Sequence, residues 1–212
     1  GFASAYYART ILEAVRQGIT DRNRIDSLCF SPSFLYDAIK DTDDDNCTAG
    51  SEIEQALTYM RQNGVALLKT KSYPDCGAND PRLVGADSRI MDYIRLFGLV
   101  NRPESVVLAT RKALSEMTPV IIGIQTTPSL KALSFWGKIW RWILSMFGAD
   151  DETSLWVPSV SNRRTGGHAV SVVGYDNEKF GGAFRIINSW CKSWGDEGYF
   201  WMRYADYAAY TK

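Results

Sequence analysis

Apolar side chains recur at helical spacing through the first half of the chain. The 3.6-residue period predicts four helices, at residues 2–15, 31–40, 51–64 and 103–117. Gly18 and Gly64 stand where glycine commonly ends a helix, and Ser31 and Ser51 stand at the starts of the second and third helices as candidate N-caps. We therefore expect this half of the chain to be helical.

The second half changes to short runs of β-branched and aromatic residues bounded by Gly, Asn and Asp. These runs predict four strands, at residues 119–125, 168–176, 183–190 and 198–204. Helices followed by strands indicate an α+β fold, with a helical lobe at about 1–118 and a β lobe at about 119–212. A cleft between two lobes is a preferred position for a binding or catalytic site.

Residues 129–154 break this pattern and are expected to form a helical insertion. A narrow polar stripe at helical spacing divides a surface rich in Trp, Phe and Ile, and the stripe consists of Ser134, Lys138, Arg141 and Ser145. The apolar run is too short and too interrupted to span a bilayer. One interpretation is a helix that packs on the body of the protein. The other is an aromatic, basic face at 134–147 that binds a membrane surface, a protein partner or a hydrophobic substrate.

The charge and cysteine content restrict the classes of partner. Lys and Arg together number 24, Asp and Glu also number 24, and this balance gives no support to nucleic acid as a partner. The four cysteines show no CxxC or CxxH spacing, so we expect no metal centre, and no motif indicates a cofactor. They allow three pairings, among which the sequence does not choose. The cysteine content favours an exported protein with one or two disulfides over a cytosolic one. The opening helix has no N-cap residue before Phe2, so we expect a preceding segment outside this chain.

Residues 41–52 contain a second candidate for metal binding. Asp41, Asp43, Asp45 and Glu52 occupy positions 1, 3, 5 and 12 of a calcium loop. Position 6, which is glycine in such loops, is Asn46. This departure favours a solvated acidic loop over a calcium site.

The only histidine, His168, lies in a setting that suggests chemistry. Gly166 and Gly167 precede it and let the backbone approach a ligand closely. Asn188 follows on the next predicted strand, and paired strands can place the two side chains together. An Asn carbonyl that accepts from one imidazole N–H fixes the tautomer and orients the other nitrogen, as in a nucleophile–base–orienter triad. Trp190 could shield that hydrogen bond from water.

The stretches GGHAVSVVGYD (166–176) and FRIINSWCKSWGDEGYF (184–200) resemble the papain family of cysteine peptidases, in its prokaryotic-type branch. That family carries His-Ala-Val, then Val-Gly-Tyr, then Asn-Ser-Trp-Gly-x-x-Trp-Gly. The stretches SYPDC, NCTAGSEIEQALTYMRQNG and GFASAYYARTILEA are similar to further parts of it, whereas 129–154 has no counterpart. The resemblance implies a two-lobed fold with an antiparallel β lobe and an active-site cleft between the lobes.

The resemblance also implies roles for individual residues. His168 would be the imidazole of the ion pair, Asn188 its orienter, Trp190 their shield, and Trp194 a support for the cleft. Gly50 would pair with an extended substrate peptide, and the Gly167 carbonyl would meet the substrate residue beside the scissile bond. The second specificity pocket would be lined by Ser51, Ile53, Gly123 and Ala169.

The nucleophile is the main departure from the family. By the resemblance, the catalytic cysteine would lie two residues before Gly1, and the oxyanion glutamine further upstream. Cys47 would occupy a disulfide position whose partner also lies upstream. Cys191 replaces a glycine of the family motif and is a poor substitute nucleophile, because its backbone there points away from the helix terminus.

Two functions of different classes follow from this pattern. The first is a cysteine endopeptidase that acts on peptide or protein substrates with a nucleophile outside these residues. The second is an inactive papain-like domain that binds a peptide or partner. The retention of both His168 and Asn188 favours the peptidase, because a binding module needs neither.

Overall fold

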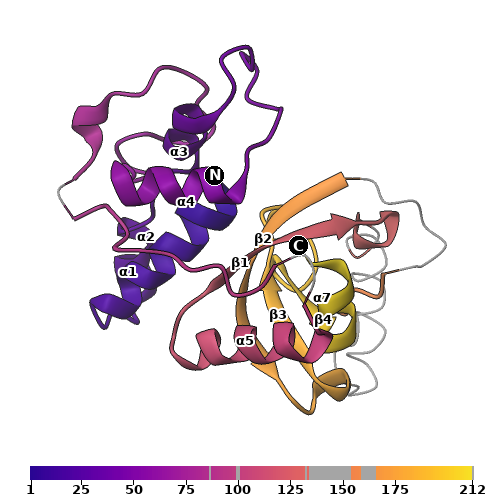
Figure 1. Cartoon of the computed structure of the whole chain (residues 1–212). Coiled ribbons are helices and arrows are strands. Elements are labelled where there is room, and N and C mark those ends of the chain that lie inside the picture. The colour runs from indigo at the N-terminus through magenta and orange to yellow at the C-terminus, as the bar shows by residue number, and fades with distance from the viewer. Residues whose placement is uncertain (86, 99–100, 132, 134–153, 159–165, 212) are drawn as a thin grey trace. The chain divides into compact units, whose positions relative to one another are not determined.

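The structure is a computed structural model, and it describes residues 1–85, 87–98, 101–131, 133, 154–158 and 166–211 (Figure 1). The chain forms two compact units, Gly1–Arg95 and Leu96–Lys212, here called unit 1 and unit 2. The sequence placed the boundary later, near residue 118. The helix at 103–115 belongs with unit 2, because its Val106 and Ala113 are part of the apolar core around the sheet.

Unit 1 is built from short helices. They are a π-helical segment Phe2–Arg9 continued by α1 (Thr10–Arg16), α2 (Arg22–Ser27), α3 (Pro32–Ile39), α4 (Ile53–Gln62) and a 3-10 turn Pro81–Leu83. Phe34, Leu35, Met60 and Val65 are almost completely buried at its centre. Three of the predicted helices are therefore confirmed here, whereas α2 was not predicted.

The ends of these helices show which sequence signals were correct. Ser31 caps α3, since its side chain accepts from the Phe34 amide at 3.0 Å. The predicted cap at Ser51 is wrong, because Glu52 holds the N-cap position of α4 and makes no side-chain cap bond. Gly64 follows α4 with φ +81°, and a Cβ there would lie 2.2 Å from Ser88 Oγ. The positive φ favours glycine at that position, and a larger residue would also displace the Ser88 side chain.

A buried charged cluster crosses the first helix of unit 1. Arg9 and Glu13 form an ion pair at 2.8 Å, with both side chains about 5% exposed. Arg16 and Gln17 also donate to the Glu13 carboxylate. The hydrogen bond from Arg16, more than the other contacts, lowers the pKa of Glu13 from 4.5 to about 2. Glu13 is therefore ionised throughout the physiological range.

Unit 2 is built around one antiparallel sheet. Its strands are β1 (Val120–Thr126), β2 (Gly166–Asp176), β3 (Ala183–Ile187) and β4 (Tyr199–Arg203), in the order β1-β2-β3-β4. The four predicted strands are confirmed, although β3 ends at Ile187 and not at residue 190. The α+β class with an antiparallel β lobe is confirmed as well.

Two of the described helices pack on the sheet of unit 2. They are α5 (Pro103–Ser115), which was predicted, and α7 (Tyr204–Tyr210), which was not. Tyr207 of α7 is fully buried, and its hydroxyl lies 3.0 Å from Thr110 Oγ1 of α5. The core of this unit is apolar and aromatic, and the largest fully buried side chains among its described residues are Trp156, Tyr207, Phe184 and Phe200. Helix and sheet faces that bury such side chains together form a stable layer pair.

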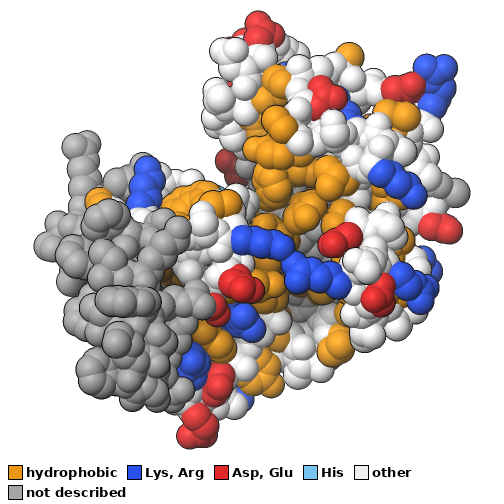
Figure 2. Space-filling model, turned by 180° about the vertical axis from the view of Figure 1, so that it is seen from behind, with side chains coloured by type: hydrophobic (Ala, Val, Ile, Leu, Met, Phe, Trp, Pro, Cys, Tyr) orange, Lys and Arg blue, Asp and Glu red, His pale blue; other side chains and the backbone are white. Residues whose placement is uncertain are grey.

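The expected insertion lies largely outside the described residues. This holds for 134–153, and therefore for the proposed aromatic face at 134–147. Within the part of the chain that the structure describes, no helix has the length and apolar character needed to cross a membrane. On the face drawn in Figure 2, basic and acidic side chains are interspersed, so the balanced net charge is also balanced locally there.

Candidate active site

Strands β2 and β3 of unit 2 position the two candidate triad residues. His168 lies near the start of β2, where it is paired with Ile124 of β1. Asn188 directly follows the last residue of β3, and its amide donates to the Gly198 carbonyl at 2.9 Å. Because β2 and β3 are antiparallel neighbours, the start of one and the end of the other lie at the same end of the sheet.

The two side chains are hydrogen-bonded. His168 Nε2 lies 2.7 Å from Asn188 Oδ1. The Ser189 amide also donates to Oδ1, at 2.8 Å, which identifies this atom as the oxygen and not the nitrogen of the side chain. The imidazole must therefore carry a proton on Nε2, and in the neutral ring Nδ1 keeps its lone pair. The arrangement makes Nδ1 the basic atom.

Two tryptophans surround this hydrogen bond. The ring of Trp190 stacks on the imidazole, with centroids 5.0 Å apart and an interplanar angle of 28°. The buried Trp194 contacts Trp190 and Phe200 edge-on, with ring centroids 5.2 Å and 5.6 Å apart. The shield expected at Trp190 is thus in contact with the imidazole, and Trp194 connects it to the apolar core.

Burial sets the protonation state of the imidazole. The pKa of His168 is lowered from its ordinary value of 6.5, mainly because burial disfavours the charged ring. The hydrogen bond to Asn188 opposes this change. The ring is therefore neutral at pH 7, and a neutral imidazole is the form that accepts a proton.

A sequence of tight turns holds the loop after Asn188. Positive φ angles occur at Cys191 (78°), Gly195 (58°), Glu197 (51°) and Gly198 (92°). A Cβ at Gly195 would lie 2.3 Å from the Tyr199 carbonyl oxygen. Cys191 is exposed, with its Sγ 2.8 Å from Ser193 Oγ, in a backbone conformation that favours glycine.

Two of the residues expected to contact substrate lie opposite each other on β1 and β2 of unit 2. Gly123 of β1 and Ala169 of β2 are register partners, and Gly167 is paired with Gln125. Gly167 is exposed, and a Cβ built there would meet no atom of the described residues within 4 Å. Nothing in the described part of the chain therefore lies against that side of Gly167.

The remaining expected contacts belong to unit 1. Gly50 is exposed and has φ +92°, Ser51 is exposed, and Ile53 is the half-buried first residue of α4. The Gly50 amide donates to the Tyr36 hydroxyl at 2.8 Å, and that hydroxyl lies 2.6 Å from Asp44 Oδ2. No local sequence pattern joins Tyr36 and Asp44 to Gly50, so the sequence alone does not indicate these two residues.

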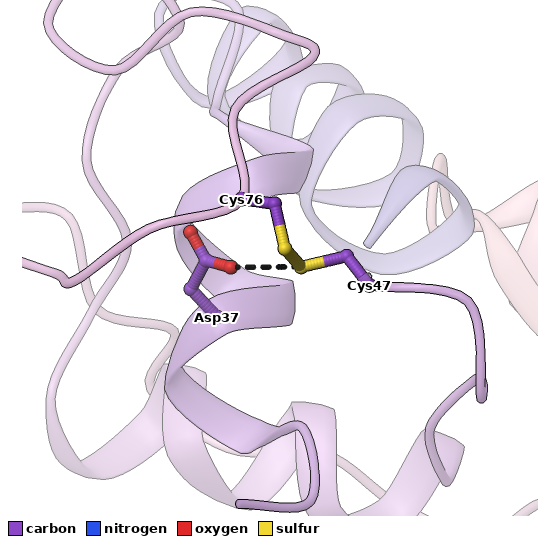
Figure 3. Close-up of side chains that lie close together, drawn as sticks. All are labelled: Asp37, Cys47 and Cys76. Atoms are coloured by element: carbon purple, nitrogen blue, oxygen red, sulfur yellow. Dashed lines mark hydrogen bonds between the residues drawn. A yellow bond between two sulfur atoms is a disulfide. The ribbon is translucent and has the colours of Figure 1, made fainter. Parts of the chain in front are cut away.

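A disulfide closes the same loop of unit 1. Cys47 is bonded to Cys76 (Figure 3), so the expectation that its partner lies upstream is wrong. Cys29 is a buried thiol. The disulfide joins the loop after α3 to the segment around residue 76, two parts of the chain separated by 29 residues.

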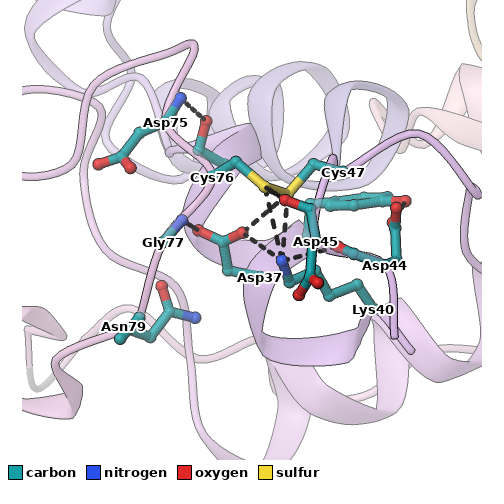
Figure 4. A network of polar contacts seen from close by, with 12 residues as sticks. Asp37, Lys40, Asp44, Asp45, Cys47, Asp75, Cys76, Gly77 and Asn79 are labelled. Atoms are coloured by element: carbon teal, nitrogen blue, oxygen red, sulfur yellow. Dashed lines mark hydrogen bonds and ion pairs between the residues drawn. A yellow bond between two sulfur atoms is a disulfide. The ribbon is translucent and has the colours of Figure 1, made fainter. Parts of the chain in front are cut away.

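Charged side chains surround this disulfide (Figure 4). The buried Asp37 carboxylate forms an ion pair with Lys71 at 2.7 Å, and its Oδ1 lies 3.3 Å from Cys47 Sγ. Lys40 Nζ lies 3.3 Å from the same sulfur. Within the described residues, the atoms close enough to share a metal ion belong to Asp37, Cys47 and Cys76. The disulfide occupies both sulfurs and Lys71 neutralises the carboxylate, so the cluster fits a structural role better than a metal site.

The acidic loop does not form the calcium site that its spacing could suggest. Among the described residues, Asp41, Asp43, Asp45 and Glu52 do not form a group close enough to hold one ion. The neighbouring Asp44 is instead the buried acid, and it accepts from the Thr48 amide at 2.9 Å. The loop is held by its own hydrogen bonds.

Comparison with known proteins relates the chain to one family of proteases. Residues 146–210 match the family described as "Papain family cysteine protease". The chain is 26% identical to cathepsin K of Mus musculus over 172 residues, which is 81% of this chain and 45% of that protein. It is 28% identical to a cathepsin L-like peptidase of Aedes aegypti over 156 residues, which is 71% of this chain and 38% of the relative. The chain thus spans less than half the length of these curated relatives.

Solved structures show the same fold. Xylellain, a cysteine protease from Xylella fastidiosa, matches with a TM-score of 0.65 at 22% identity, covering 98% of this chain and 75% of that one. Digestive procathepsin L 3 of Tenebrio molitor matches with a TM-score of 0.62 at 19% identity, covering all of this chain and 63% of the other. The chain is related to the papain family of cysteine proteases. Its α+β fold is papain-like, and the stretch around His168 and Asn188 lies on the part of the sequence that matches the family.

Proposed function

We propose that this chain is part of a cysteine endopeptidase that hydrolyses peptides or proteins through a Cys-His-Asn triad. His168 is the base, Asn188 is its positioning residue, and the nucleophilic cysteine is a residue outside these 212. The observation that carries the proposal is the 2.7 Å hydrogen bond from His168 Nε2 to Asn188 Oδ1, which leaves Nδ1 as the basic atom.

The chemistry follows from that tautomer. Nδ1 takes the proton of a thiol, and the thiolate attacks the peptide carbonyl. The imidazolium then gives this proton to the leaving amine, and the same nitrogen activates the water that hydrolyses the acyl-enzyme. Asn188 keeps the ring in one orientation through these steps, and Trp190 limits the access of water to their hydrogen bond.

The proposed substrate contacts are backbone groups and small side chains. Gly50, Ser51 and Ile53 supply them in unit 1, and Gly123, Gly167 and Ala169 in unit 2. We further propose an exported protein, because a disulfide such as Cys47–Cys76 persists in oxidising compartments.

The test uses the natural full-length protein and a fluorogenic peptide. We expect His168→Ala to lower kcat/KM by at least about a thousandfold, because it removes the base. Asn188→Ala leaves the base but releases its orientation, so we expect a loss of about a hundredfold. Asn177→Ala changes an asparagine at an exposed turn of the same unit and serves as the matched control, which should keep full activity.

A peptide mass map of the natural protein should be made first. A cysteine two residues before Gly1 supports the triad, and alkylation of that cysteine should abolish hydrolysis. Another residue at that position, or peptide hydrolysis that survives His168→Ala, rejects the proposal. In the first case the alternative applies, a papain-like domain that binds peptides without cleaving them, and in the second case a base other than His168 carries the hydrolysis.

A further inference from the structure

The Gly50 amide is already used within unit 1. It donates to the Tyr36 hydroxyl at 2.8 Å, and the hydroxyl lies 2.6 Å from Asp44 Oδ2. The same hydroxyl is 3.2 Å from the Gly50 carbonyl oxygen, but it has only one proton to donate. The shorter of the two contacts is to Asp44, whose carboxylate is a stronger acceptor than the Gly50 carbonyl. The hydrogen bonds therefore run from the Gly50 amide to Tyr36 and from Tyr36 to Asp44.

Asp44 is fixed as the end of this chain of hydrogen bonds. It is buried and accepts from the amides of Thr48 at 2.9 Å and Ala49 at 3.3 Å. The hydrogen bond from Tyr36 is the largest of the causes that lower the pKa of Asp44, so the carboxylate is ionised at neutral pH. Burial raises the pKa of Tyr36, so its hydroxyl keeps its proton. Neither group can reverse its role near neutral pH.

The surrounding loop holds this arrangement in place. Lys40 Nζ donates to the Asp44 carbonyl at 3.0 Å, and the disulfide at Cys47 ties the next turn to Cys76 (Figure 4). Gly50 itself is exposed, with φ +92°, and a Cβ there would meet no atom within 4 Å. The exposed backbone group of Gly50 with unused hydrogen-bonding capacity is thus its carbonyl.

We propose that Tyr36 and Asp44 are positioning residues that occupy the Gly50 amide, so that Gly50 recognises a substrate peptide by its N–H and not by its C=O. This inference rests on the proposed function, in which Gly50 contacts the substrate. It makes recognition at Gly50 one-sided, whereas paired strands normally exchange both a donor and an acceptor at such a position.

The test compares modified peptides cleaved by the natural full-length protein. Since Gly167 is proposed to meet the residue beside the scissile bond, we assign the next residue, the second before the bond, to Gly50. One peptide is N-methylated at that residue, which removes the donor, and another carries a thioamide there, which weakens the acceptor. N-methylation should raise KM about fivefold with kcat unchanged, because one hydrogen bond is lost. The thioamide should leave KM within about twofold of the parent peptide.

Tyr36→Phe removes only the hydroxyl and should change this pattern. The released Gly50 amide can then donate to the substrate carbonyl, so the thioamide should now raise KM about fivefold relative to the parent peptide. Tyr93→Phe is the matched control, since its hydroxyl lies 2.7 Å from Thr58 and not at Gly50, and it should behave as the unchanged protein. In a second variant, Asp44→Asn, the thioamide should also raise KM relative to the parent peptide, by a smaller factor than in Tyr36→Phe.

Two results would overturn the inference. One is that N-methylation and the thioamide raise the KM of the unchanged protein equally, which means that both backbone groups of Gly50 bind substrate. The other is a Gly50 amide whose hydrogen exchange is no slower in the unchanged protein than in Tyr36→Phe. Failure of the peptidase proposal is distinct, because the parent peptide would then not be cleaved at all, whatever the exchange of Gly50.

Discussion

Unit 1 and unit 2 bury different kinds of side chain. Unit 1 encloses ionised groups and a disulfide among short helices, and the charged side chains that it buries include Arg9, Glu13, Asp44 and Lys71. Unit 2 encloses a continuous apolar and aromatic core between one sheet and two helices. Apolar burial depends little on pH or redox state, whereas ion pairs and disulfides depend on one or the other. We therefore expect acid and reductant to act on unit 1 first.

The distribution of tryptophan makes the comparison measurable. All seven tryptophans lie in unit 2, so intrinsic tryptophan fluorescence reports on that unit. Peptide-resolved hydrogen exchange reports on unit 1.

The largest effect is expected from the core of unit 2. Phe200→Ala removes a fully buried ring that packs on Trp156 and Trp194, and it should lower the free energy of unfolding by about 4 kcal/mol. Urea denaturation followed by fluorescence measures the change. Met91→Ala, at a side chain that is 98% exposed, is the control and should change stability by less than about 0.5 kcal/mol. A loss below about 1 kcal/mol for Phe200→Ala would contradict a well-packed core.

The next largest effect is expected from the disulfide of unit 1. The double substitution Cys47→Ser with Cys76→Ser opens a loop closed over 29 residues and should cost about 3 kcal/mol. Hydrogen exchange should accelerate in peptides covering 33–50, while the fluorescence midpoint in urea stays the same. Reductant should reproduce the effect in the unchanged protein and add nothing to the double variant. Faster hydrogen exchange in unit 2 alone would contradict the expectation that loss of the disulfide acts on unit 1.

Acid should act through Glu13. The folded-state pKa of this carboxyl, about 2, lies below its ordinary value of 4.5, so it stabilises the fold fully above pH 4.5 and less as pH falls toward 2. We expect a loss of about 2 kcal/mol over that range, seen as faster exchange around residues 9–17. Glu13→Gln should remove this pH dependence while lowering stability at pH 7. If Glu13→Gln keeps the full pH dependence of exchange, other carboxyl groups cause that dependence.

The two units also differ in how much of them the sequence could predict. In unit 2, His168 and Asn188 lie on strands joined by a short turn, so a local pattern was sufficient to place them together. In unit 1, the Cys47–Cys76 bond and the Tyr36–Asp44–Gly50 hydrogen bonds join positions whose partners no periodicity indicates. The cap expected at Ser51 failed for a related reason, since the extended residue at the N-cap is Glu52.

The smallest effect is expected at Cys191, beside the candidate triad. This residue has φ 78°, a conformation that costs a residue with a Cβ about 1 kcal/mol relative to glycine. Cys191→Gly should therefore raise the free energy of unfolding by about 1 kcal/mol, measured by fluorescence in urea. Ser193→Ala removes the hydroxyl that contacts the thiol and should change little. If Cys191→Gly destabilises the protein and Ser193→Ala does so equally, the contact between the two side chains outweighs the backbone strain, and the loop next to His168 depends on a polar bond as unit 1 does.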